Sequence, residues 1–232
     1  MGGSANGGTT GGAGSSGNGG AGGRGGSGPA TPVILSVDFV GGGNGANPVP
    51  MTATESAGVV AARNWNSASG NSGSKASLVF SDGTTTSASL TWNSPANGIT
   101  SGGIWRLGYT DAPGDVRMMN GYLDPGGTAT VTVSNLPAAI TTGGYDVYVY
   151  TYGDVLANQT RSYGYAIGTA SFTVTQTGPA ANPFPRFSRA ADHGSGTYVL
   201  FRKVTGAAFT LTATPADRAP INGLQIVWPA SP

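Results

Sequence analysis

Apolar and polar residues alternate with a period of two along most of this chain, as they do in strands that bury one face. Val33, Leu35, Val37 and Phe39 share one face of the first predicted strand. Similar alternation predicts further strands at 128–134, 145–152, 163–167, 170–176, 197–203, 207–213 and 222–228, with weaker candidates at 57–62 and 104–107. Helical periodicity does not recur, so we expect an all-β fold.

The clearest local signal is a hairpin near residue 80. Leu78 and Phe80 lead into 81–84, whose Asp-Gly pair favours a tight turn, and Leu90 and Trp92 resume the alternation. Some ten short strands separated by Gly, Pro, Asn and Asp loops are typical of two packed sheets. We therefore predict a jelly-roll β-sandwich of about ten short antiparallel strands.

Residues 1–28 differ in composition from the remainder of the 232-residue chain. They hold 15 of the 41 glycines and a single charge, Arg24. A segment with so little apolar surface has nothing to offset its ordering entropy, so we predict a disordered linker at 1–28 and one module at 29–232. A linker of this kind indicates a monomeric module in a larger multidomain protein, and its composition favours a secreted, extracellular one.

The charge and cysteine content exclude several classes of function. The formal net charge is +1 with only 9% charged residues, so no basic surface predicts a nucleic-acid partner. No run of 18 apolar residues predicts a membrane span, and the absence of Cys removes thiolate metal sites. The one histidine, His193, lies between Asp192 and Ser195 without a G-x-S-x-G motif, and Glu55 is the only glutamate. We therefore predict that the chain is not an enzyme.

Several segments resemble a module of large exported bacterial proteins and, beyond it, the galactose-binding-like and malectin-like jelly rolls. The resemblance is carried by Val37–Gly42, Ala57–Val60, Asn64–Asn66, Asn120–Asp124, Val131–Pro137, Tyr145–Asp154 and Arg218–Val227. It implies that the first and last strands pair and that the module binds carbohydrate. It also implies a possible structural Ca²⁺ near the joined termini, with Asp38 and Asn222 as ligands. The alternative is that Asp38 is solvated or pairs with a cation such as Arg218.

The segment 145–154 supplies the first candidate sugar-binding surface. Alternation places Asp146, Tyr148, Tyr150, Tyr152 and Asp154 on one face, opposite a valine face that reads as core. Tyr148 and Tyr152 would lie about 13 Å apart at strand rise, enough to underlie a short oligosaccharide. The competing interpretation is that both faces are buried, with the tyrosyl hydroxyl groups bonded to the backbone.

The second candidate surface is a loop cluster of rings and charges. Trp65 has polar neighbours on both sides, and Trp105 is followed by Arg106, Tyr109 and Asp111. Aromatic rings stack on the C–H faces of sugars while charged groups meet the hydroxyls. The alternative is that the rings of Trp65 and Trp105 are buried beneath loops.

Two functions are therefore expected from the sequence. The first is a non-catalytic carbohydrate-binding module that holds a polysaccharide or oligosaccharide for a larger polysaccharide-acting or cell-wall-associated protein. The alternative is a structural or adhesive spacer of a bacterial surface protein, without a small ligand.

Overall fold

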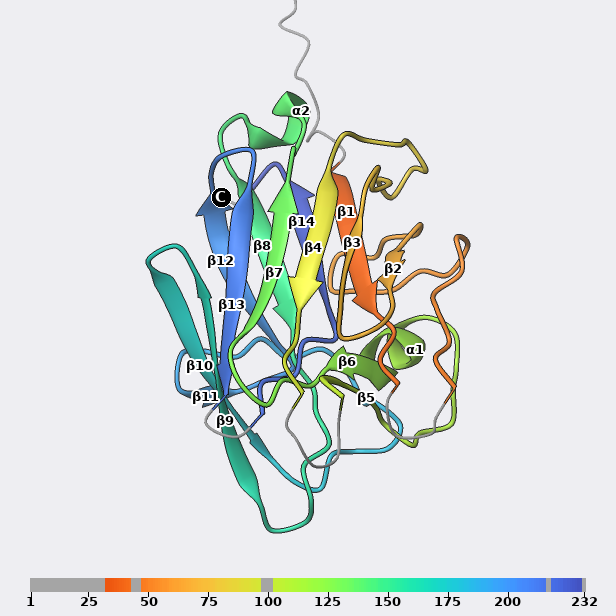
Figure 1. Ribbon diagram of the computed structural model, residues 1–232, viewed down its shortest axis with the longest axis vertical. Coiled ribbons are helices and arrows are strands. Elements are labelled where there is room, and N and C mark those ends of the chain that lie inside the picture. Colours follow the sequence, from red (N-terminus) through yellow and green to blue (C-terminus); the bar gives the residue numbers. More distant parts are fainter. Residues whose placement is uncertain (1–31, 43–46, 97–101, 216–217, 231–232) are drawn as a thin grey trace, which may run out of the picture. The chain divides into compact units, whose positions relative to one another are not determined.

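The protein is described here by a computed structural model covering residues 32–42, 47–96, 102–215 and 218–230. The chain divides into two units, Met1–Ala30 and Thr31–Pro232. The predicted linker at 1–28 lies outside the described residues. The second unit is a β-sandwich (Figure 1), which confirms the predicted all-β fold class.

Two sheets and one short ribbon make up the second unit. The five-stranded sheet has the order β12 (Tyr198–Val204), β8 (Tyr145–Tyr150), β14 (Gly223–Trp228), β1 (Val33–Phe39) and β2 (Asn66–Ala68). The seven-stranded sheet has the order β11 (Gly194–Ser195), β10 (Ala170–Thr177), β9 (Thr160–Ile167), β13 (Phe209–Pro215), β7 (Ala129–Ser134), β4 (Ser89–Asn93) and β3 (Ser72–Lys75). The ribbon pairs β5 (Ile104–Arg106) with β6 (Gly121–Leu123).

The first and last described strands pair, as the family resemblance implied. β1 and β14 run antiparallel, with Val33 opposite Trp228 and Asp38 opposite Gly223. The predicted hairpin is also present, because Phe80 N donates to Thr84 O at 2.9 Å. Two pairings are parallel rather than antiparallel, β1 with β2 and β10 with β11.

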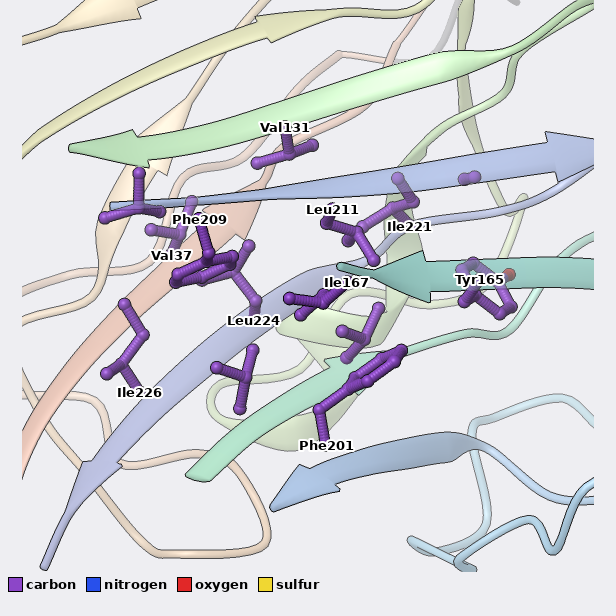
Figure 2. Close-up of a cluster of buried hydrophobic side chains, with 14 of the residues drawn as sticks. Val37, Val131, Tyr165, Ile167, Phe201, Phe209, Leu211, Ile221, Leu224 and Ile226 are labelled. Atoms are coloured by element: carbon purple, nitrogen blue, oxygen red, sulfur yellow. The ribbon is translucent and has the colours of Figure 1, made fainter. Parts of the chain in front are cut away.

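The main core lies between the two sheets (Figure 2). Val37 and Leu224 enter it from the five-stranded sheet, and Val131 and Leu211 enter it from the seven-stranded sheet, all fully buried. Val37 lies on the apolar face predicted for its strand, and the other three residues lie in strands predicted at 222–228, 128–134 and 207–213. Each such side chain contributes about 1.5–3 kcal/mol relative to an exposed one.

A second apolar cluster covers the outer face of the five-stranded sheet. Tyr148, Tyr150 and Tyr152 are only 7%, 0% and 6% exposed, beneath residues such as Met118 and Phe184. The prediction of a solvent-facing tyrosine platform is therefore wrong, because loops pack over both the rings and the strands that carry them. β8 is buried on both faces, which is the competing interpretation of the same alternation.

Short elements account for most other differences from the predicted strands. β2, β3, β6 and β11 were not predicted, nor were the helices α1 (Asp115–Asn120) and α2 (Ala138–Thr141). Each is six residues or fewer, too short for a period to be recognised. The weak candidate at 57–62 is a turn closed by a bridge between Ala57 and Ala62. No helix in the described ranges is long and apolar enough to cross a membrane.

Candidate functional site

Trp65 belongs to the second apolar cluster rather than to a binding surface. Its side chain is 6% exposed, and its indole N–H donates to Ala62 O at 2.9 Å. The ring lies 6.2 Å from that of Tyr150, centroid to centroid. The prediction that Trp65 contacts sugar is therefore wrong, since the loop that carries it folds its ring inward.

Arg106 and Asp111 form part of a charged network that joins two loops. Arg106 is 4% exposed and donates to Asp111 Oδ1 at 2.8 Å. Arg117 donates to Asp111 Oδ2 at 2.7 Å and also pairs with Glu55. A buried guanidinium needs a partner of this kind, because an unpaired buried charge is strongly destabilising. Arg106 is thus structural, while Asp111 is partly exposed at the edge of the network.

Trp105 lies on a different side of the ribbon, opposite Tyr122 in the β5–β6 pairing. Its ring is partly buried, and the Arg218 guanidinium carbon lies 5.4 Å from the ring centroid. Arg218 also pairs with Asp124 at 2.8 Å, and the Asp124 side chain is fully buried. The cation therefore holds Trp105 to the body of the sandwich through a cation–π contact and an ion pair.

Tyr109, in the loop after β5, and Asp154, beyond the end of β8, lie near each other. The Tyr109 and Tyr152 hydroxyl groups are hydrogen-bonded, and Tyr152 donates to Ala181 O at 2.9 Å. Asp154 N donates to the Tyr122 hydroxyl at 3.0 Å, which fixes the position of this residue. Burial raises the pKa of Tyr109 and of Tyr152, so both phenols remain neutral hydrogen-bonding groups.

We call the four partly exposed side chains Trp105, Tyr109, Asp154 and Arg218 the end cluster. It lies at the end of the sandwich that carries the β5–β6 ribbon (Figure 1). The buried Tyr122 joins two of its members: burial raises the pKa of the Tyr122 hydroxyl, the charge of Arg218 lowers that pKa, and the charge of Asp154 raises it. Two aromatic rings, a guanidinium and a carboxylate are the groups that bind sugar rings and their hydroxyls.

Only half of the end cluster was predicted from the sequence. Trp105 and Tyr109 were expected in the loop cluster, whereas Arg218 appeared only in the family resemblance and as an alternative partner of Asp38. Asp154 was assigned to the tyrosine row, but it lies beyond the end of β8. No local pattern links Arg218 to Trp105, because their contact depends on how the segment before β14 crosses the ribbon.

The residues proposed to bind Ca²⁺ do not fit a calcium site. The Asn222 amide N–H groups donate to Met119 O, Gly121 O and Tyr152 O at 2.8, 3.1 and 3.0 Å. Its side-chain oxygen accepts from Tyr152 N at 2.6 Å, so the whole amide is engaged with the backbone. Among the described residues, no group of three or more His, Cys, Asp or Glu could hold a metal. Asn222 is a structural bridge, and Asp38 is left without a second ligand.

Asp38 is instead a buried carboxyl group with few partners. It is 1% exposed, and Ser67 Oγ donates to it at 3.2 Å. Burial raises its pKa to about 7, opposed by the Ser67 and Met51 hydrogen bonds and by the charge of Arg106. The alternatives of a solvated Asp38 and of pairing with Arg218 are both wrong, since Arg218 pairs with Asp124.

This pKa makes stability depend on pH. Because the folded pKa lies above the unfolded value of 3.8, stability should fall as pH rises from 4 to 7. Asp38→Asn should remove that contribution. Between pH 4 and 7, the free energy of unfolding of the variant should therefore rise relative to that of wild type by about 1.4 kcal/mol for each pH unit. Urea unfolding of both proteins at several pH values measures the difference. Asp82→Asn, at an exposed carboxylate whose pKa is lowered, is the control. Equal slopes of unfolding free energy against pH for wild type and Asp38→Asn would contradict the prediction.

His193 does not form a catalytic relay with its neighbours. Its side chain is 77% exposed, and His193 Nε2 lies 3.6 Å from Asp192 Oδ2. Ser195 Oγ instead lies 3.2 Å from Thr175 Oγ1, so the serine is paired elsewhere. The arrangement is that of a surface turn, in which Asp192 Oδ1 accepts from Thr173 N at 2.7 Å.

Comparison with known proteins leaves the family of this chain undetermined. No family model and no curated protein sequence matches it. One solved structure that resembles it is an exo-β-1,3-galactanase from Phanerochaete chrysosporium with galactose, at 16% identity and a TM-score of 0.31. The match covers 63% of this chain and 31% of the galactanase chain, so this chain spans less than a third of that protein. At so low a TM-score, nothing about the ligand of this chain follows from the galactanase.

Proposed function

We propose that this chain is a non-catalytic carbohydrate-binding module whose glycan site is the end cluster. The observation that carries the proposal is the gathering of Trp105, Tyr109, Asp154 and Arg218 on one partly exposed surface. They come from three segments, β5 with the loop after it, the end of β8 and the segment before β14. Tyr109 is hydrogen-bonded to Tyr152, the Asp154 backbone N–H to the Tyr122 hydroxyl, and Arg218 contacts the ring of Trp105. A preorganised site of this kind binds without the cost of ordering its side chains.

The carboxylates of the site favour binding over catalysis. Glycoside hydrolysis commonly uses two carboxyl groups that both face the sugar, about 5–10 Å apart. Asp124, the acidic neighbour of the end cluster, is fully buried and paired with Arg218. Asp154 is then the carboxylate of the cluster that a ligand would meet, and it suits a hydrogen bond to sugar hydroxyls.

The proposed setting is a larger exported protein that acts on polysaccharide or belongs to a cell wall. It is supported by the composition of residues 1–28, which is that of a flexible linker. The module would be monomeric and would hold its parent protein on the glycan. A spacer without a ligand is the alternative that the following experiment distinguishes.

Trp105→Ala should weaken glycan binding about tenfold, which corresponds to about 1.4 kcal/mol. The ring supplies the stacking face of the site, and its loss also frees Arg218 from its cation–π contact. Affinity electrophoresis against a panel of soluble polysaccharides identifies the glycan, and calorimetry with its oligosaccharide measures the change. Trp228→Ala is the matched control, since Trp228 is also partly buried on a strand and donates one hydrogen bond, to Thr142 O at 2.8 Å.

Three outcomes would count against the proposal. Equal losses of affinity in Trp105→Ala and Trp228→Ala would place the glycan elsewhere. Failure of the folded wild-type protein to bind any polysaccharide of the panel would favour the spacer. Release of reducing sugar by wild type, abolished in Asp154→Asn, would show that the module is an enzyme.

A further inference from the structure

A hollow with a different chemistry lies between two hairpin turns of the sandwich. It measures about 530 Å³ and opens between the β9–β10 turn and the β12–β13 turn. Its polar lining consists of two cationic side chains and three hydroxyl groups, namely Arg202, Lys203, Thr169, Thr205 and Thr210. No carboxylate is among the residues that line it. We call this feature the cationic hollow.

A β-bulge brings both cations to the surface. Consecutive side chains of a regular strand point to opposite faces, so one of Arg202 and Lys203 would point inward. The pairing of β12 with β8 shifts register between Phe201 and Val204, and both cationic residues are exposed. Bulges re-aim side chains in this way and often lie next to functional sites.

The bulge is held by a specific contact. Lys203 adopts φ = 53°, a left-handed conformation that a lysine rarely occupies. Its backbone N–H donates to Asp146 Oδ1 at 3.0 Å, and the Asp146 side chain is fully buried. The backbone strain of about 1–3 kcal/mol is therefore maintained by a buried carboxylate beneath the strand.

The cationic hollow and the end cluster lie at opposite ends of β8. Val204 pairs with Tyr145 at the start of this strand, whereas Tyr198 pairs with Tyr150 at its end. The chain continues from Tyr150 to Asp154 in the end cluster. Five residues at strand rise separate the two regions by about 17 Å, so one can be altered without contact to the other.

We propose that the cationic hollow is a second binding site, which takes the carboxylate or sulfate groups of an acidic polysaccharide. The two cations are complementary in charge to such groups, and the threonine hydroxyls can form hydrogen bonds with the hydroxyls of the sugar units that carry them. The hollow is open and larger than a single ion requires, which favours a polymer over a free anion. The inference does not rest on the function proposed for the end cluster.

The double variant Arg202→Gln/Lys203→Asn tests the site in the full chain. It removes both charges, and asparagine tolerates the left-handed backbone of position 203. Polygalacturonate supplies carboxylates, dextran sulfate supplies sulfates, and neutral dextran and inorganic phosphate are the comparison ligands. We expect wild type to bind one of the acidic polymers at 20 mM salt, to bind it more weakly at 300 mM, and the double variant to bind it about tenfold more weakly.

A matched pair of charges elsewhere provides the control. Arg63→Gln/Lys75→Asn makes the same change in net charge at two exposed positions, and Lys75 lies on β3 at the opposite edge of the seven-stranded sheet from β10. Its binding to the acidic polymer should change less than threefold.

Equal losses in the two double variants, or no binding of either acidic polymer by wild type at 20 mM salt, would overturn the proposal. Tighter binding of double-stranded DNA than of both acidic polysaccharides would also overturn it. Trp105→Ala should leave this binding unchanged, so failure of one site does not imply failure of the other.

Discussion

Asn222→Ala should lower the free energy of unfolding by about 3–5 kcal/mol, although it removes only a short polar side chain. Each buried backbone group left without a partner costs about 1–3 kcal/mol. The Asn222 amide satisfies three backbone carbonyl groups and one backbone N–H, and its side chain is fully buried. Urea unfolding measures the loss, and Asn93→Ala, at an exposed position, should change stability by less than about 0.5 kcal/mol.

Asn222→Asp sharpens this test. An ionised carboxylate cannot donate to the carbonyl oxygens of Met119, Gly121 and Tyr152, and would instead face all three at close range. At pH 7, we expect Asn222→Asp to lower the free energy of unfolding at least as much as Asn222→Ala. Part of that loss should be recovered when the carboxyl is protonated. A loss below about 1 kcal/mol in both variants would show that water replaces the amide and that Asn222 is not the bridge described here.

The same bridge connects stability to the candidate binding site. Asn222 bonds the segment that leads into Tyr122 and the segment that leads into Asp154. Both segments position the end cluster. Loss of glycan affinity is therefore expected in Asn222→Ala even at temperatures where it is folded, whereas Trp105→Ala should lose affinity with a smaller loss of stability.

Tyr150→Ala should cost about 3–5 kcal/mol of stability, as large-to-alanine changes in cores do. The ring is fully buried, with the rings of Phe187 and Trp65 at 5.2 and 6.2 Å. Its hydroxyl donates to Gln225 Oε1 and accepts from Val59 N at 2.8 Å. Tyr150→Phe keeps the packing but leaves Val59 N unpaired, so it should cost about 1–2 kcal/mol.

Thermal and urea unfolding of both variants separate packing from hydrogen bonding. Tyr198→Ala is the control, because this neighbouring ring is only partly buried and should cost less than Tyr150→Ala. The burial of Tyr150 would be disproved by an alanine variant that keeps wild-type stability while losing affinity for a glycan. That result would restore the tyrosine row as a binding platform.

Much of the sandwich was determined by local sequence. Alternation located β1, β7 and β14 to within a residue or two, because a strand that faces a core needs an apolar residue at every second position. The turn at 81–84 followed from its Asp-Gly pair, whose backbone preferences act within four residues. These features depend on neighbours in the chain, and the sequence alone therefore predicted them.

What covers a strand face was decided only by the tertiary structure. The tyrosines of β8 alternate like a solvated aromatic row, but the segments that carry Trp65, Met118 and Phe184 return over them and exclude water. Long-range packing of the segment before β14 likewise made Asn222 a bridge and placed Arg218 against Trp105. Alternation specifies which residues share a face, while burial and contact depend on segments distant in sequence, whose packing no local period encodes.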